Sequence, residues 1–233
     1  MEFNDTTVLI TGAGRGIGRA LTEEFLRRGV RRVYAGMRAP LPHADPRVVP
    51  LALDVTDEEQ IRAAAARVDA LDVLVNNAGV FEPDDLTGRA ALERHLAVNL
   101  FGPWAVTGAF EPHLVAAGGT VVTNVSLMAL APLPVTPAYS LSKAAALSLT
   151  QSQRALLAGR GVRVHAVLTG PTDTDMTRDL PIPKATPESV AAAILDAVER
   201  GEEEIFPDPM SHRLESGWRD GVAKVLERQN TAA

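Results

Sequence analysis

The chain has 233 residues, 46% of them hydrophobic and 22% charged, which is the composition of an ordinary globular protein. This length suits one α/β domain and is too short for two ordinary enzyme domains. A net charge of -6 argues against nucleic acid as the main partner, because phosphate binding relies on concentrated Lys and Arg. The absence of cysteine excludes thiolate nucleophiles, and the five histidines have no zinc-ligand spacing, so no metal site is expected.

Residues 1–7 are polar and acidic, unlike a signal peptide, and no run approaches the roughly 18 apolar residues of a membrane span. We therefore expect a cytoplasmic protein that binds a small molecule and has neither a nucleic-acid nor a membrane partner.

Short β-branched runs alternate with helical patterns along the chain. Strands are expected at residues 8–10, 32–35, 48–53, 73–75, 120–125, 162–167 and 204–206. Helices are expected at residues 17–28, 57–68, 92–117, 139–160, 187–199 and 211–228. Such alternation requires crossover connections, and the nearly continuous apolar strands require helices on both faces. The prediction is a three-layer Rossmann-type α/β fold with a doubly wound parallel sheet of about seven strands. We expect one domain over residues 1–233, with a C-terminal helical tail from about residue 209 and the ligand at the carboxyl ends of the strands.

A glycine-rich turn lies between the first expected strand and helix. It reads Thr11-Gly12-Ala13-Gly14-Arg15-Gly16-Ile17-Gly18. Glycine permits the tight turn and lets backbone N–H groups approach a pyrophosphate at the helix N-terminus. A phosphate loop is excluded because no Gly-Lys-Ser/Thr follows, so the turn indicates a dinucleotide site.

The residues after the second expected strand bear on the choice between NADP and NAD. An NAD site usually has an acidic residue about 20 residues past the glycines, and residues 29–44 contain none. Arg38 lies there instead, and with Arg15 it is suited to a 2′-phosphate. The alternative is that both arginines are solvated surface charges.

Tyr139 and Lys143 lie four residues apart at the start of an expected helix, so their side chains share one face. A phenol with a pKa near 10 is a weak acid–base catalyst at neutral pH, and a nearby ammonium stabilises its phenolate form. The alternative is a core tyrosine beside a surface lysine. Ser126 ends the fifth expected strand and is suited to polarising a carbonyl, while Asn99 interrupts an apolar helix.

These motifs, in this order and spacing, resemble the short-chain dehydrogenase/reductase family from residue 6 to about residue 206. The motifs that carry the resemblance are the glycine turn, Asp54-Val55, Asn76-Asn77-Ala78-Gly79, Asn99, Ser126 and Tyr139-x-x-x-Lys143. One departure is Thr169, which stands where the family usually has proline before Gly170.

The resemblance implies a mechanism. Tyr139 gives a proton to a carbonyl oxygen while a nicotinamide cofactor delivers hydride, and Ser126 holds that carbonyl. Lys143 binds the nicotinamide ribose and lowers the pKa of the phenol, and Asn99 positions a water that links Lys143 to solvent. The implied cofactor contacts are Gly12, Gly14, Arg15, Gly16, Ile17, Gly18, Arg38, Asp54, Val55, Asn77, Ala78, Gly79, Tyr139, Lys143, Gly170, Thr172 and Thr174.

Residues 127–138 form the expected substrate wall, which is apolar and uncharged. This suggests an apolar aldehyde or ketone, or the corresponding secondary alcohol. The alternative is that these residues, like Phe81, Trp104 and Met176, pack on the domain or on a partner subunit. In the family the helices that correspond to 92–117 and 139–160 pair across two-fold axes, so a homodimer or homotetramer is expected.

The leading hypothesis is an NADP(H)-dependent carbonyl reductase. One alternative is an NAD(H)-dependent alcohol dehydrogenase. A second is a non-catalytic regulatory protein that binds a dinucleotide, which has no physical need for a tuned phenol.

Overall fold

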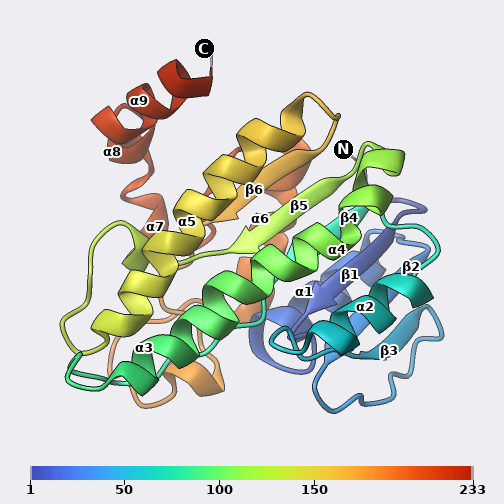
Figure 1. The fold of residues 1–233 in the computed structure, drawn as a ribbon, viewed down its shortest axis with the longest axis horizontal. Helices are drawn as coiled ribbons and strands as arrows, with labels where there is room; N and C mark the ends of the chain where they lie inside the picture. The colour runs from blue at the N-terminus through green and yellow to red at the C-terminus, as the bar shows by residue number, and fades with distance from the viewer. Residues whose placement is uncertain (1, 232–233) are drawn as a thin grey trace.

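A seven-stranded parallel sheet with the order β3-β2-β1-β4-β5-β6-β7 forms the centre of the computed structural model, which describes residues 2–231 (Figure 1). The strands are β1 (Thr7–Thr11), β2 (Arg32–Met37), β3 (Val48–Ala52), β4 (Val73–Asn76), β5 (Thr120–Asn124), β6 (Arg163–Val167) and β7 (Glu204–Ile205). Successive strands are added on one side of β1 as far as β3 and then on its other side from β4 onward, as in a doubly wound fold, although all the strands are parallel. The predicted fold class and all seven strands are therefore confirmed.

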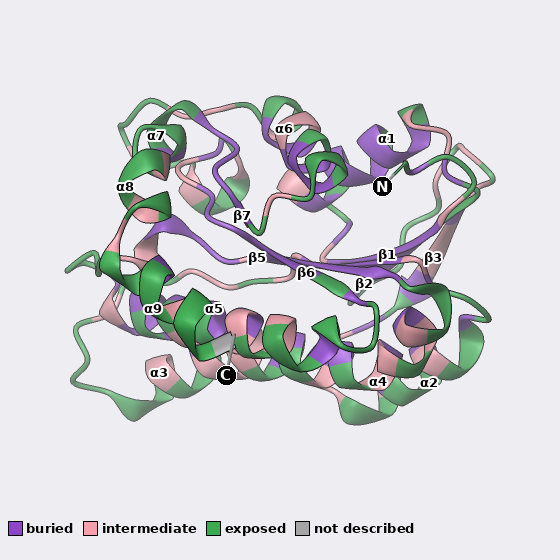
Figure 2. Cartoon of the chain, turned by 90° about the horizontal axis from the view of Figure 1, so that it is seen from above, coloured by how far each residue is buried: buried purple, intermediate pink, exposed green. Residues whose placement is uncertain are grey.

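Helices cover both faces of this sheet (Figure 2). One face carries α1 (Gly16–Arg27) and α6 (Pro187–Arg200). The other face carries α2 (Glu58–Arg67), α4 (Gly102–Ala117) and α5 (Pro137–Ala158). The sheet's side chains are buried on both faces: in β1, Ile10 belongs to the cluster that includes Phe25 of α1, and Leu9 belongs to the cluster that includes Phe110 of α4. This two-sided burial is the reason that the strands are apolar throughout.

The helix expected at residues 92–117 is longer and is interrupted. It begins earlier as α3 (Arg89–Leu96), widens into a π-helical turn over Ala97–Phe101, and continues as α4. The apolar pattern runs through the widened turn without a break, so the pattern alone did not reveal it. Asn99 lies within this turn.

The tail expected as one helix over residues 211–228 is three short helices. They are α7 (Pro209–His212), α8 (Glu215–Arg219) and α9 (Val222–Thr231). Gly221 separates α8 from α9, and a Cβ atom there would lie 2.7 Å from the carbonyl oxygen of Gly217. Within residues 2–231, none of the helices combines the length and the apolar character that a bilayer-crossing helix needs.

Candidate active site

The predicted site residues come together at the carboxyl edge of the sheet. Because every strand is parallel, the segments that follow β1 to β6 all emerge at this edge. Those segments contain the glycine turn after β1, Arg38 after β2, Asp54 and Val55 after β3, Asn77 to Gly79 after β4, Ser126 after β5, and Gly170, Thr172 and Thr174 after β6. Short 3₁₀ helices lie at Leu127–Ala129, after β5, and at Asp175–Thr177, after β6.

The glycine turn is packed so closely that two of its positions exclude a side chain. At Gly18 a Cβ atom would lie 2.2 Å from the carbonyl oxygen of Gly12, and Gly12 itself has a φ of 66°. Helix α1 begins at Gly16, and no side chain caps its first turn. The backbone N–H groups of its first turn, including that of Ile17, and the N–H of Gly14 before it are thus available for a pyrophosphate.

A series of side-chain hydrogen bonds links this turn to the ends of β5 and β6. The Asn77 amide nitrogen donates to the carbonyl oxygens of Thr11 at 3.0 Å and Gly12 at 3.3 Å. Asn124 Nδ2 donates to Asn77 Oδ1 at 3.2 Å, and Thr169 Oγ1 donates to Asn124 Oδ1 at 2.6 Å. The turn, β5 and β6 are therefore coupled through amides. No motif in the sequence marked Asn124. The Thr169 hydroxyl donates a hydrogen bond that the proline usual at this position in the family could not donate.

Tyr139 lies in the first turn of α5, behind Pro137 at the helix start, and is buried together with Ser126. Burial raises the pKa of the Tyr139 hydroxyl, and a hydrogen bond with the Ser126 side chain partly counteracts this. The Ser126 hydroxyl also accepts from the Met128 N–H at 3.1 Å, which fixes its direction. The two hydroxyls that were predicted from separate motifs are thus neighbours.

Lys143 is 6% exposed, although it carries an amine. Its Nζ donates to the carbonyl oxygen of Asn124 at 2.9 Å and lies 5.7 Å from the centroid of the Tyr139 ring. Burial lowers the pKa of Lys143 to about 8. At this separation burial, rather than the ammonium, is the main influence on the pKa of Tyr139.

Asn99 is buried in the π-helical turn and holds the segment after β4. Its Oδ1 accepts from the Val80 N–H at 2.9 Å, and its Nδ2 donates to the Val80 carbonyl at 3.0 Å and to Ser142 Oγ at 3.0 Å. The Ser142 hydroxyl donates to the carbonyl of Tyr139 at 2.7 Å. Widened turns of this kind often occur at functional sites, and this one directs an amide toward α5.

The two arginines expected at a 2′-phosphate differ in their surroundings. Arg38 is exposed and has no ion pair with another described residue. Arg15 pairs with Asp175 at 3.1 Å, and the Arg15 side chain is 73% exposed. A pair exposed to this degree contributes little stability, so Arg15 is free to exchange partners.

The remaining predicted cofactor contacts lie on the loops around the glycine turn. Asp54 Oδ1 accepts from Thr56 N–H at 2.9 Å, as a turn residue does, and Val55 is buried. After β6, the Gly170 N–H donates at 2.7 Å to Asp208, a buried carboxylate that caps α7. Thr174 lies close to Gly16, since a Cβ on Gly16 would be 3.1 Å from the Thr174 methyl group. Asp208 had no signal in the sequence, because its partner is 38 residues away.

The expected substrate wall divides into two parts. Leu127 is buried in a small cluster with Leu147 and Phe206, and Trp218 from α8 packs on that cluster. In contrast, Val135 is 61% exposed. Trp104 and Met176 are exposed as well, whereas Phe81 contacts the Tyr139 ring.

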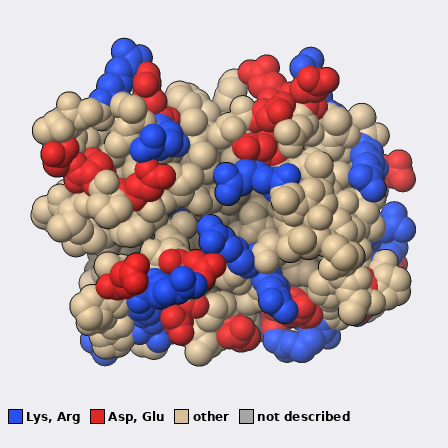
Figure 3. Space-filling model, turned by 90° about the horizontal axis from the view of Figure 1, so that it is seen from below, with Lys and Arg blue, Asp and Glu red and all other residues tan. Residues whose placement is uncertain are grey.

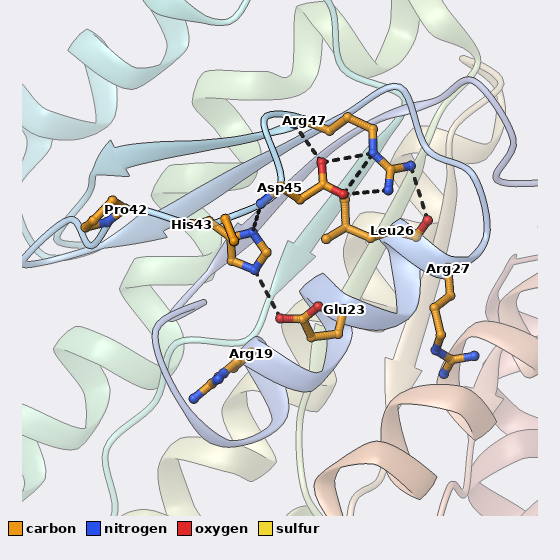
Figure 4. A pocket seen from close by; sticks show the side chains of 9 residues that line it. Arg19, Glu23, Leu26, Arg27, Pro42, His43, Asp45 and Arg47 are labelled. Atoms are coloured by element: carbon orange, nitrogen blue, oxygen red, sulfur yellow. Dashed lines mark hydrogen bonds and ion pairs between the residues drawn. The ribbon is translucent and has the colours of Figure 1, made fainter.

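Two surface cavities flank α1, and neither is lined by Ser126, Tyr139 or Lys143. The cavity in Figure 4 has a volume of about 620 Å³ and lies between α1 and the segment before β3. Its charged groups largely pair with one another, His43 with Glu23 at 3.0 Å and Arg47 with Asp45 at 2.7 Å. The second cavity is lined by Gly16, Thr174 and Asp175, so it adjoins the glycine turn. Figure 3 shows that the face seen from below is hollowed near its middle, with Lys and Arg side chains along the hollow.

Comparison with known proteins identifies the family. Residues 6–184 match the family model described as short chain dehydrogenase. A short-chain dehydrogenase from Penicillium crustosum is 41% identical over 186 residues, which are 72% of this chain and 66% of that protein. The chain thus spans just under two thirds of that relative's length.

Two further relatives are informative. A sorbitol dehydrogenase from Cereibacter sphaeroides is 34% identical, over 74% of this chain and 73% of that protein. The crystal structure of a short chain dehydrogenase from Burkholderia cenocepacia J2315 in complex with NADP has a TM-score of 0.89, 37% identity, and covers 98% of this chain and 99% of that one. This chain therefore belongs to the short-chain dehydrogenase family, whose members are oxidoreductases that bind nicotinamide dinucleotides and act on small molecules.

Proposed function

We propose that this protein is an NADP(H)-dependent carbonyl reductase, which in the reverse direction oxidises a secondary alcohol. The observation that carries the proposal is the burial of Tyr139, whose hydroxyl hydrogen-bonds to Ser126 and whose ring centroid lies 5.7 Å from the Lys143 amine. Burying two ionisable side chains, Tyr139 and Lys143, beside the Ser126 hydroxyl at the carboxyl edge has a cost in stability that a purely structural role does not justify.

In the direction of reduction, the Tyr139 hydroxyl donates its proton to the carbonyl oxygen of the substrate. The Ser126 hydroxyl donates a hydrogen bond to the same oxygen and stabilises the charge that develops there. When bound, a nicotinamide cofactor would supply the hydride to the carbonyl carbon, and with the proton from Tyr139 this would give the alcohol. The phenolate left on Tyr139 is stabilised by the Lys143 ammonium, which also binds the nicotinamide ribose.

Recovery of the proton requires a path from Tyr139 to solvent. We propose that Asn99 positions a water between Lys143 and solvent, since a Cβ on Gly79 would lie 3.3 Å from Asn99 Oδ1 and 3.8 Å from Lys143 Nζ. The small residue at position 79 therefore leaves room beside both groups.

The glycine turn fits a dinucleotide because its amides are uncapped and Gly12 and Gly18 admit no side chain. We assign its pyrophosphate to Gly14, Gly16 and Ile17, the adenine to Asp54 and Val55, the adenine ribose wall to Asn77, Ala78 and Gly79, and the nicotinamide carboxamide loop to Gly170, Thr172 and Thr174. For the 2′-phosphate we propose Arg38 together with Arg15 once it leaves Asp175. The NADP in the Burkholderia structure supports this preference, and NAD(H) is the alternative.

Thermal unfolding with NADPH, with NADH and without ligand tests the cofactor assignment, because a ligand that binds only the folded state raises the unfolding temperature. We expect a larger shift with NADPH. Arg38→Glu should remove most of that excess. Arg67→Glu makes the same charge change at the end of α2, at the opposite edge of the sheet, and should preserve the excess. An unchanged preference in Arg38→Glu contradicts the 2′-phosphate assignment.

Tyr139→Phe separates an enzyme from a regulatory protein. NADPH oxidation is followed with a panel of apolar aldehydes and ketones, and the best substrate is kept for the variants. Tyr139→Phe should lose nearly all turnover and keep the NADPH-induced thermal shift, since it lacks only a hydroxyl. Normal turnover in this variant contradicts the proposed mechanism. A thermal shift with no turnover of any carbonyl in the wild-type protein favours the regulatory alternative.

Exposed apolar residues support a proposal for the substrate class and one for the oligomeric state. We propose an apolar carbonyl substrate beside residues 127–138, and a homodimer or homotetramer through α4 and α5, where Trp104 is 60% and Leu156 76% exposed. A monomeric mass in light scattering contradicts the oligomer. We also propose that the chain folds as one domain and acts in the cytoplasm.

A further inference from the structure

His95, on α3, is a fully buried titratable residue that the mechanism above does not use. Its Nδ1 lies 2.8 Å from the carbonyl oxygen of Ala91, and its Nε2 lies 3.2 Å from the backbone nitrogen of Glu82. A carbonyl oxygen only accepts and a backbone N–H only donates. The proton must therefore be on Nδ1, and Nε2 is the acceptor, so this site requires the neutral ring.

The ring of Tyr139 has two aromatic neighbours. The centroid of Phe81 lies 5.0 Å away with an interplanar angle of 83°, and that of His95 lies 6.1 Å away at 74°. Both are edge-to-face arrangements, which aromatic rings favour over a face-to-face stack. The orientation of the Tyr139 ring thus depends on where Phe81 and His95 stand.

The residues directly before and after Phe81 are both hydrogen-bonded to buried side chains. Asn99 binds both backbone polar groups of Val80, the residue before it. His95 binds the N–H of Glu82, the residue after it. The side chain of Glu82 also pairs with Arg94 at 2.7 Å, but those two side chains are 48% and 59% exposed. The partly buried bond to the fully buried His95 is therefore the stronger constraint on this side of Phe81.

We infer that His95 is a positioning residue for the reaction: by accepting the N–H of Glu82 it keeps Phe81 against the ring of Tyr139, and Phe81 orients the phenol. This inference rests on the proposed role of Tyr139. It explains why a polar aromatic residue is buried behind the catalytic helix, where an aliphatic side chain fills space without an acceptor for Glu82. A misplaced hydroxyl reduces turnover without weakening cofactor binding, because His95 does not lie on the cofactor loops.

The inference is tested first by NMR of the ligand-free protein with ring-labelled tyrosine. The chain has two tyrosines, so Tyr34→Phe assigns the signals of Tyr139. Phe81→Leu defines the shift that follows loss of the neighbouring ring. His95→Leu should move the Tyr139 signals in the direction seen in Phe81→Leu. His95→Gln, which keeps an acceptor for Glu82, and Arg94→Leu, which removes only the exposed ion pair, should move them far less.

Unmoved Tyr139 signals in His95→Leu overturn the inference, and so does an equal movement in Arg94→Leu. If His95→Leu does not fold, His95→Asn takes its place, because Asn offers a donor near Ala91 and no acceptor that reaches Glu82. A role confined to stability would lower the unfolding temperature without this pattern of shifts.

Kinetics then separate this inference from the proposed function. His95→Leu should lower kcat roughly tenfold with the KM for NADPH unchanged, and His95→Gln should restore most of it. If Tyr139→Phe abolishes turnover but His95→Leu retains the wild-type kcat, only the inference fails. If Tyr139→Phe retains turnover, the proposed function fails, whatever the NMR shifts.

Discussion

The Lys143 ammonium donates to the backbone carbonyl of Asn124 at 2.9 Å, and this bond ties α5 to the end of β5. The side chain of Asn124 bonds to Asn77, which holds the glycine turn. Through Asn124, the amine that we place next to the nicotinamide ribose and the turn that we place on the pyrophosphate are parts of one network. The two ends of the proposed cofactor site are therefore positioned relative to each other by residues that need not touch the cofactor.

Lys143→Met should stabilise the protein at pH 7. Burial lowers the pKa of Lys143 from its ordinary 10.5 to about 8. Because the pKa of Lys143 is lower in the folded protein, the unfolded chain binds more protons between pH 8 and 10.5, and the free energy of unfolding rises with pH over this range. Below pH 8 the amine is charged in both states, so the free-energy cost of burying the ammonium is fully present. That shift corresponds to about 3 kcal/mol, and the lost bond to Asn124 offsets part of it, so we expect a gain of about 1 to 2 kcal/mol.

Urea unfolding at pH 7 and pH 9.5 measures this gain. The variant should also lose the rise in stability above pH 8, together with turnover. Lys184→Met is the matched control, since the Lys184 amine lies at the surface. A loss of stability at pH 7 in Lys143→Met contradicts the argument that the ammonium is held at a cost.

Thr169→Val should destabilise the protein by about 1 to 2 kcal/mol and weaken NADPH binding. The substitution keeps the shape of the side chain but leaves Asn124 Oδ1 without its donor. Asn124 then loses part of its hold on Asn77 and the glycine turn. Thr169→Ser retains the hydroxyl and should restore both properties in urea unfolding and fluorescence titration with NADPH. Equal affinities in all three proteins would show that the network does not reach the turn.

The fold was predictable because its signals are local. Apolar runs and helical periods recur along the chain, and each loop at the carboxyl edge follows directly from a predicted strand. Tyr139 and Lys143 were recognisable together because a helix places residues four apart on one face. The π-helical turn at Asn99 was not predictable, since the apolar pattern passes through it unchanged.

Residues that act through backbone groups left no such pattern. His95 binds the N–H of Glu82, and Asp208 binds the N–H of Gly170, so neither depends on the identity of its partner's side chain. Asn124 resembles any polar residue at a strand end, and its importance lies in three bonds to distant segments. The exposure of Val135 likewise depends on how the loop leaves β5, which no period in the sequence encodes.

Gly18→Ala should abolish the NADPH-induced thermal shift. The added Cβ would meet the Gly12 carbonyl oxygen at 2.2 Å and the Asn77 amide at 2.6 Å, and a backbone atom has little room to retreat. We expect a loss of stability of about 2 kcal/mol or more, because the turn must open. Gly217→Ala adds the same methyl group in α8, where nothing lies within 4 Å, and should be neutral or slightly stabilising. A normal thermal shift in Gly18→Ala would contradict the assignment of this turn to the pyrophosphate.

Lys224→Met should release α9 from the body of the protein. Lys224 is 4% exposed, and its Nζ lies 2.6 Å from Glu203, 2.8 Å from Glu204 and 3.0 Å from Glu227. These carboxylates outweigh burial and raise the pKa of Lys224, so its contribution to stability is present at neutral pH and is lost only above its ordinary pKa. Without the ammonium, Arg154, at 2.6 Å, is the one cation among residues 2–231 that remains in an ion pair with the buried Glu204 carboxylate. Because removal of one member of a buried ion network costs about 3 to 5 kcal/mol, the least costly response is local opening of α9.

Hydrogen exchange of α9 amides should therefore accelerate more than tenfold, while exchange in β1 and β4 changes little. Arg213→Met removes an exposed cation from the same tail and should leave α9 exchange as it is. Unchanged α9 exchange in Lys224→Met would mean that the apolar contacts around Trp218, rather than the ion network, hold the tail beside the proposed substrate wall.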